Sequence, residues 1–246
     1  TIYNMLKVAV VTGGAKGLGA FLSTTLARDG YTVVVHYKSS KKEAEKIISA
    51  VKNKQPDSFA ISADLKIESE VLKMFGEIEK RLGRIDLLVN NVGNFLFKSL
   101  GKTTNAEFKD LMESNVYSTL FCSRAALPIM KKRNAGHIIN IGAVGAERLI
   151  IRENSMPYFL GKTGIYVLTK TMAWEEAKNG VHINMISPAS MVADIFDNSD
   201  FPMGRPAEYT DVYKALAFLT SDEAYYINGA NIEVSGAFVP GMDKAE

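Results

Sequence analysis

Strand-like and helix-like segments alternate along this chain from one end to the other. The strand-like segments are apolar at consecutive positions, as in Val33-Val34-Val35 and Ile138-Ile139. That pattern is typical of strands covered on both faces, whereas a strand with one face in water alternates apolar and polar residues. Such strands, separated by helices of about ten residues or more, predict a parallel sheet with helices on both faces, doubly wound by right-handed crossovers.

The same pattern gives the bounds of the predicted elements. The predicted strands cover residues 7–11, 31–37, 58–63, 85–89, 137–141, 181–186 and 231–234. The predicted helices cover residues 18–29, 41–54, 68–82, 106–130, 157–178 and 207–219. Because no repeat, linker or low-complexity tract interrupts this order, residues 1–246 are predicted to form a single α/β domain. Ligands of doubly wound sheets bind outside the carboxyl ends of the strands, so the residues after each strand are the candidates for function.

Composition excludes several classes of function. The chain is 47% hydrophobic and 23% charged, which is ordinary for a globular domain, and its Lys and Arg residues are interleaved with Asp and Glu, so no nucleic-acid surface is expected. The single Cys122 cannot form an internal disulfide, and the three histidines are too far apart in sequence to predict a metal site. No apolar run approaches the ~20 residues of a membrane span, and no secretory leader is visible, so a cytoplasmic protein is predicted.

A glycine-rich turn follows the first predicted strand and leads into a helix. It reads Thr12-Gly13-Gly14-Ala15-Lys16-Gly17-Leu18-Gly19. Glycines at such a place allow a tight turn and bring backbone N–H groups close to a pyrophosphate, which the helix N-terminus also attracts. The spacing differs from the commonest dinucleotide fingerprint, so an ordinary glycine-rich turn is the alternative.

The end of the second predicted strand bears on the choice of cofactor. The segment His36-Tyr37-Lys38-Ser39-Ser40 contains no Asp or Glu, which an NAD site uses to hold the ribose 2′-hydroxyl. Lys16, Lys38 and the serine hydroxyls can instead hold a 2′-phosphate, so the sequence favours NADP(H). A solvated basic loop is the alternative for Lys38.

Four further motifs complete a recognisable set. They are Asn90-Asn91-Val92-Gly93, Asn115, Tyr158-x-x-x-Lys162 and Ser187-Pro188. Together with residues 12–19, and in this order, they resemble the short-chain dehydrogenase/reductase family over nearly the whole chain. The resemblance implies a single Rossmann-type doubly wound domain with a mostly seven-stranded parallel sheet and helices on both faces. It also implies an NADP(H)-dependent oxidoreductase acting on a small molecule, and a homo-oligomer, with a tetramer expected.

The resemblance also implies roles for individual residues. A reduced nicotinamide delivers hydride, and a proton must reach the attached O or N. Tyr158 is expected to be the general acid, Lys162 to favour its ionised form and hold the nicotinamide ribose, and Asn115 to support a proton-relay water. A solvent-facing position in the middle of a helix is the alternative for Asn115. The implied cofactor-binding residues are Gly13, Lys16, Gly17, Leu18, Gly19, His36, Tyr37, Lys38, Ser39, Asp64, Leu65, Asn91, Gly93, Tyr158, Lys162 and Pro188.

Spacing alone does not select the catalytic pair. The Tyr-x-x-x-Lys spacing occurs at Tyr3/Lys7, Tyr37/Lys41, Tyr158/Lys162 and Tyr166/Lys170. The last two pairs share one predicted helix, along which Tyr166 lies ~12 Å beyond Tyr158. Tyr158 and Lys162 are therefore the pair expected at the cofactor end.

One position departs from the family pattern. The family usually has Ser, or Asp in some pteridine reductases, just past the fifth strand, where this chain has Ala143. An alanine side chain can neither donate nor accept a hydrogen bond. A slow or differently organised enzyme, a constructed variant, and a silent NADP(H)-binding sensor remain as explanations, and Ser155 or Glu147 are candidates to supply the missing group. The intact tyrosine, lysine and asparagine argue against the sensor.

The predicted substrate is a small flat heterocycle. Phe95 follows the fourth strand and can stack on such a ring. His36-Tyr37 and Glu147-Arg148 look similar to pteridine reductases, so hydride transfer to a C=N or C=O bond of a pterin-like compound is favoured, and a 3-oxoacyl thioester is the alternative. Residues 189–205 are predicted to form a substrate lid. The predicted substrate residues are Phe95, Ala143 and Tyr158.

Overall fold

A parallel sheet forms the centre of the molecule. The computed structural model describes residues 7–148, 153–191 and 197–238. The seven strands of the sheet lie in the order β3-β2-β1-β4-β5-β6-β7. They are β1 (Lys7–Val11), β2 (Tyr31–Tyr37), β3 (Phe59–Ser62), β4 (Leu87–Asn90), β5 (Gly136–Ile141), β6 (Val181–Pro188) and β7 (Asn231–Val234). Every neighbouring pair is parallel, so the predicted doubly wound α/β domain with a seven-stranded parallel sheet is confirmed.

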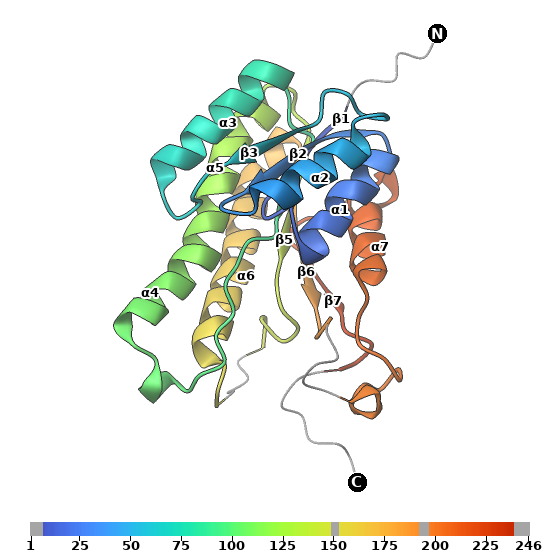
Figure 1. Ribbon diagram of the computed structural model, residues 1–246. Coiled ribbons are helices and arrows are strands. Elements are labelled where there is room, and N and C mark those ends of the chain that lie inside the picture. The colour runs from blue at the N-terminus through green and yellow to red at the C-terminus, as the bar shows by residue number, and fades with distance from the viewer. Residues whose placement is uncertain (1–6, 149–152, 192–196, 239–246) are drawn as a thin grey trace.

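Helices cover both faces of this sheet (Figure 1). They are α1 (Gly17–Arg28), α2 (Lys41–Val51), α3 (Glu68–Leu82), α4 (Asn105–Met112), α5 (Ser118–Lys131), α6 (Met156–Glu176) and α7 (Tyr209–Leu219). Short 3₁₀ turns cover Leu100–Lys102, Ala177–Asn179, Asn198–Asp200 and Asp222–Ala224. Val33 and Val35 pack in the core cluster that includes α1 and α7, whereas Val34 packs in the cluster that includes α3 and α5. Burial on both faces is the reason that consecutive strand positions are apolar.

The long helix predicted over residues 106–130 is interrupted. A π-helical turn, Glu113–Tyr117, separates α4 from α5. Such a turn inserts one extra residue into a helix and occurs frequently at functional sites. A prediction based on a 3.6-residue period cannot register a single extra residue, which is why the sequence missed the turn. Asn115 lies inside it and is fully buried, so the solvent-facing alternative for this residue is wrong.

The sheet order places the ligand-binding edge. Because β1 lies between β2 and β4, the winding reverses there, and the loops after these strands come together at their carboxyl ends. Ser187 and Pro188 were expected just after the sixth strand but are its last residues, paired with Glu233 and Val234 of β7. Among the residues described, no helix combines the length and apolar character needed to cross a bilayer.

Candidate active site

A pocket of about 270 Å³ opens outside the carboxyl ends of β1 to β4. The predicted cofactor-binding residues that line it are Gly13, Lys16, His36, Tyr37, Lys38, Ser39, Asp64 and Leu65. Its other lining residues are Ala15, Ser40, Ala63, Lys66, Val92, Asn94, Asp110, Ser114 and Ser118. Each of the first four strands therefore contributes its following loop to one pocket, as expected where the winding reverses.

The glycine turn brings the start of α1 directly against the end of β1. A Cβ atom on Gly19 would lie 2.2 Å from the carbonyl oxygen of Gly13, and one on Gly14 would lie 2.8 Å from the Oγ atom of Ser23. Gly13 and Gly17 also have positive φ angles of 60° and 52°. The first amides of α1 have no partner within the helix and lie at its positive end, so this corner suits a pyrophosphate.

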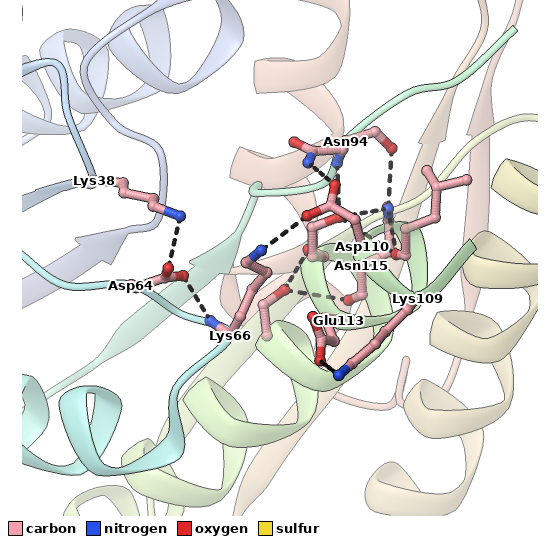
Figure 2. Close-up of polar contacts among 11 residues, drawn as sticks. Lys38, Asp64, Lys66, Asn94, Lys109, Asp110, Glu113 and Asn115 are labelled. Carbon is pink, nitrogen blue, oxygen red and sulfur yellow. Dashed lines mark hydrogen bonds and ion pairs between the residues drawn. The ribbon is translucent and has the colours of Figure 1, made fainter. Parts of the chain in front are cut away.

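Two lysines at the pocket are each paired with a carboxylate. Lys38 Nζ lies 2.6 Å from a carboxylate oxygen of Asp64 (Figure 2), and Lys16 Nζ lies 3.4 Å from Glu43. Although burial raises it, hydrogen bonds from Lys38 and from the backbone of Lys66 hold the pKa of Asp64 below its ordinary value. Both lysine side chains remain largely exposed, so either can exchange its carboxylate for a phosphate of a ligand.

Tyr158 and Lys162 lie one turn apart at the start of α6. Lys162 Nζ is 5.5 Å from the centre of the Tyr158 ring and donates a hydrogen bond to the carbonyl of Ile141, at the end of β5 (2.9 Å). Lys162 is buried, and that burial lowers its pKa to about 8. Because this value lies above neutral pH, the ammonium remains mainly charged there and faces the phenol ring.

The second Tyr-x-x-x-Lys pair of α6 has the same local geometry but a different setting. Lys170 Nζ lies 5.6 Å from the centre of the Tyr166 ring. Lys170 is exposed, however, and Tyr166 packs against the cluster that contains Ala146 and Met185. Burial thus distinguishes the two pairs, and it is Lys162 that donates a hydrogen bond to the end of a strand.

The side-chain oxygen of Asn115 and the Lys162 ammonium both lie beside Gly93. The Nδ2 group of Asn115 donates to the carbonyls of Asn94 and Leu111, both at 3.0 Å, so both amide protons are used. Its Oδ1 atom is buried and has no hydrogen-bond partner among the described residues. A Cβ atom on Gly93 would lie 2.3 Å from this oxygen and 3.3 Å from Lys162 Nζ. A buried acceptor of this kind requires a water or ligand donor, which fits the expected relay.

A network missed by the sequence analysis holds Asn115 in place. The side chain of Asn94 donates to Asp110 (2.6 Å), which also accepts from Lys66 (2.8 Å), as Figure 2 shows. The backbone N–H of Asn94 donates to the Ser114 hydroxyl (3.3 Å). The only signal in the sequence was the polar character of the residues after β4 and in α4. It could not identify the contacts, because their register depends on the π turn.

Two residues expected to bind cofactor also tie strand ends to neighbouring segments. The side chain of Asn91 donates to the carbonyl of Thr12 (3.0 Å), and so ties the end of β4 to the end of β1. Pro188 ends β6, and its carbonyl accepts from the backbone N–H of Val144 in the loop after β5 (3.1 Å). Both therefore shape the loops around the pocket.

Ala143 lies in that loop, two residues beyond the carbonyl that holds Lys162, and is buried. Of the two candidates for the missing polar group, Glu147 accepts a hydrogen bond from Asn231 of β7 (3.1 Å). Ser155 directly precedes α6, three residues before Tyr158. The described hydrogen bond of Glu147 is therefore with the edge strand β7 and not with Tyr158.

An aromatic side chain covers Tyr158. The Phe95 ring packs edge-to-face on it with centres 4.9 Å apart, and Phe95 is 56% exposed. In the predicted lid, Phe201 is buried against Phe238, 4.7 Å away, beside Val144. Residues 192–196 of that segment lie outside the described residues.

Comparisons with known proteins decide the family. A family model described as short chain dehydrogenase matches residues 7–201. The chain belongs to this family. It is 35% identical over 247 residues to the 3-oxoacyl-[acyl-carrier-protein] reductase FabG of Staphylococcus aureus, covering 95% of this chain and 98% of the relative. The FabG of Staphylococcus epidermidis is 34% identical, covering 94% and 98%.

A solved structure agrees with these relatives. A Bacillus thuringiensis protein assigned as a 3-oxoacyl reductase superposes with a TM-score of 0.86 at 28% identity, covering 96% of this chain and 99% of that one. The chain is therefore an oxidoreductase of a family that uses nicotinamide cofactors. None of these three relatives is a pteridine reductase, so they support the alternative substrate class rather than the pterin-like one favoured by the sequence.

Proposed function

We propose that this protein is an NADP(H)-dependent reductase of the keto group of 3-oxoacyl thioesters. The proposal rests chiefly on the convergence of the Tyr158 ring, the Lys162 ammonium and the Asn115 oxygen at the carboxyl edge of the sheet, beside a pocket of dinucleotide-binding type. The names of the relatives support the thioester as substrate class.

The preference for NADP(H) rests on charge at the end of β2. No carboxylate follows Tyr37 until Glu43, and Glu43 is paired with Lys16. A 2′-phosphate can replace Glu43 and Asp64 as the ion-pair partner of Lys16 and Lys38. It also adds hydrogen-bond acceptors that a ribose hydroxyl lacks.

Tyr158, Lys162 and Asn115 each have a separate role in the proposed reaction. When bound, the reduced nicotinamide supplies the hydride. Tyr158 donates its hydroxyl proton to the keto oxygen, and the Lys162 ammonium stabilises the phenolate that remains. Lys162 then returns a proton to the phenolate, and a water whose hydrogen bond Asn115 Oδ1 accepts replaces the proton that Lys162 has lost. Phe95 keeps bulk water from the phenol.

Phe95 also supports a second candidate substrate. Its ring is more than half exposed and stands against the catalytic tyrosine, where it can stack on a flat heterocycle. A dihydropterin is therefore the second candidate, with the same residues protonating a ring nitrogen.

Turnover of the two substrate classes tests the proposal. We expect nicotinamide absorbance to fall when NADPH is mixed with acetoacetyl-CoA, and Tyr158→Phe to lower this rate ~10³-fold by removing the proton donor. Tyr166→Phe, the matched change one pair further along α6, should keep the wild-type rate. Turnover with dihydrobiopterin alone would establish the second candidate instead, and turnover with neither would refute the assignment of Tyr158. The expected tetramer remains a prediction that light scattering tests.

A further inference from the structure

His36 lies beneath the glycine turn with both ring nitrogens engaged. The residue belongs to β2, is only 2% exposed and lines the pocket. The backbone N–H of Gly13 donates to its Nδ1 atom (3.0 Å), and its Nε2 atom contacts the carbonyl of Ala63 after β3 (3.0 Å). Neither ring nitrogen is left for a ligand, so the direct contact with cofactor expected from the sequence is not what this ring offers.

The contacts fix the ring's protonation state. An amide N–H can only donate, so Nδ1 must carry the lone pair and the single proton must sit on Nε2, from which it donates to Ala63. Burial lowers the pKa of His36 to about 4, against smaller opposing effects of the Ala63 hydrogen bond and of Asp64. The ring is therefore neutral at neutral pH, as both contacts require.

His36 holds two consecutive amides of the turn. Its side chain accepts from Gly13, and its carbonyl accepts from the backbone N–H of Gly14 (2.9 Å). Gly13 in turn supports α1, because its carbonyl oxygen lies within 2.2 Å of where a Cβ of Gly19 would be. A shift of Gly13 therefore moves the first turn of α1, whose amides face the pyrophosphate position.

We propose that His36 is a positioning residue for the cofactor: as a neutral imidazole with its proton on Nε2, it locks the glycine turn and so places the first amides of α1. The inference rests on the proposed binding of NADP(H) in this pocket. It predicts that His36 acts on the pyrophosphate through the backbone, and only weakly on the adenosine end of the ligand.

Binding of NADP⁺ and of 2′-AMP to one variant tests whether His36 acts on the pyrophosphate rather than on the adenosine end. His36→Phe keeps a ring but can neither accept from the Gly13 N–H nor donate to the Ala63 carbonyl, so it no longer holds the glycine turn in its binding geometry. Calorimetry should show NADP⁺ binding weakened about 10-fold, and 2′-AMP, which lacks the pyrophosphate, weakened less than about 3-fold. His36→Asn, whose amide oxygen can accept from Gly13, should recover most of the NADP⁺ affinity. His182→Phe, at the opposite edge of the sheet, should leave both affinities unchanged.

A spectrum of the wild-type protein tests the tautomer without any substitution. With ¹⁵N-labelled histidine, the His36 ring should show an unprotonated Nδ1 and a protonated Nε2 with and without NADP⁺. A protonated Nδ1, equal NADP⁺ binding by His36→Phe and wild type, or an equal loss for NADP⁺ and 2′-AMP would overturn the inference. Absence of NADP⁺ binding by the wild-type protein would overturn both this inference and the proposed cofactor.

Discussion

A charged side chain lies at each end of the strands, and the two are satisfied differently: Asp86 is partly buried at the amino ends, and Lys162 is buried at the carboxyl ends. At the amino edge, the Asp86 carboxylate accepts from the backbone N–H of Val8 (2.7 Å) and from Arg84 (2.6 Å) and Arg133 (2.7 Å). At the carboxyl edge, the buried ammonium of Lys162 donates to a single carbonyl, that of Ile141, among the hydrogen bonds of the described residues.

The pKa shifts separate these two charges. Although burial raises it, the hydrogen bonds from Arg84, Val8 and Arg133 hold the pKa of Asp86 below its ordinary value, so folding favours its charged form. Burial lowers the pKa of Lys162 to about 8, so folding disfavours its charged form. Stability alone does not explain why the fold buries the Lys162 ammonium with so few hydrogen-bond partners. This residue therefore points to function at the carboxyl ends of the strands.

Both pKa values are lowered by folding, so stability increases with pH in both cases, but over different pH ranges. Asp86 contributes stability above its unfolded pKa, and that stability is lost as pH falls through the lower folded value. Lys162 costs stability while it is charged, so the free energy of unfolding rises as pH increases from about 8 toward the ordinary lysine pKa of 10.5.

Lys162→Met should produce the largest effect and separate activity from stability. Removing the ammonium should lower turnover ~10³-fold, because the phenolate loses its cation. The free energy of unfolding should stay the same or rise, because a buried charge with one partner is replaced by an apolar chain of similar length. Steady-state kinetics and urea unfolding measure the two quantities.

Lys170→Met is the matched control for this experiment. Lys170 has the same spacing to a tyrosine on the same helix but is exposed. It should change neither turnover nor stability. A marked loss of stability in Lys162→Met would contradict the comparison, since it would make Lys162 a structural charge like Asp86.

Asp86→Asn should show the reverse pattern. It leaves Arg84 and Arg133 without their carboxylate, so the free energy of unfolding should fall by roughly 2 kcal/mol. Turnover and the Kd for NADP⁺ should remain at wild-type values, because the residue lies at the edge opposite the pocket. Asp57→Asn, in an exposed turn, controls for the loss of a negative charge. An equal loss of activity and stability would show that the two edges are coupled.

The sheet could be predicted because its signal is local. Val33, Val34 and Val35 are apolar in succession, and each fills one of the two cores, so the sequence alone indicates a strand covered on both faces. Tyr158 and Lys162 could be proposed as the catalytic pair only with the family resemblance and their place at the start of the helix, since the same spacing occurs at Tyr166 and Lys170.

The remainder of the site depends on contacts between distant segments. Asn94 reaches Asp110 only because the loop after β4 passes over α4, and Lys66 joins them from the loop after β3. His36 was expected only as a cofactor-binding residue, and the partners of its ring come from the turns after β1 and β3. No periodicity in the sequence reports such pairings.

Ala143→Ser should produce the smallest effect, and it tests whether the site lacks a hydroxyl donor at the carboxyl ends of the strands. A hydroxyl there, two residues beyond the Ile141 carbonyl, would add a donor beside the carbonyl being reduced. Turnover with acetoacetyl-CoA should rise at least ~10-fold, below the ~10²–10³-fold that such a donor supplies in sites built around it. Binding of NADP⁺ should not change, because residue 143 does not line the cofactor pocket.

Ala146→Ser adds a hydroxyl to the same turn and should give no gain, which separates a positioned donor from mere polarity. The Ala146 N–H donates to the Ala143 carbonyl (3.0 Å), so both alanines belong to the same turn. Stopped-flow measurement of the first turnover isolates hydride transfer from product release. An unchanged first turnover in Ala143→Ser would mean that residue 143 does not face the phenol of Tyr158, and that the reductase is complete without a hydroxyl in this turn.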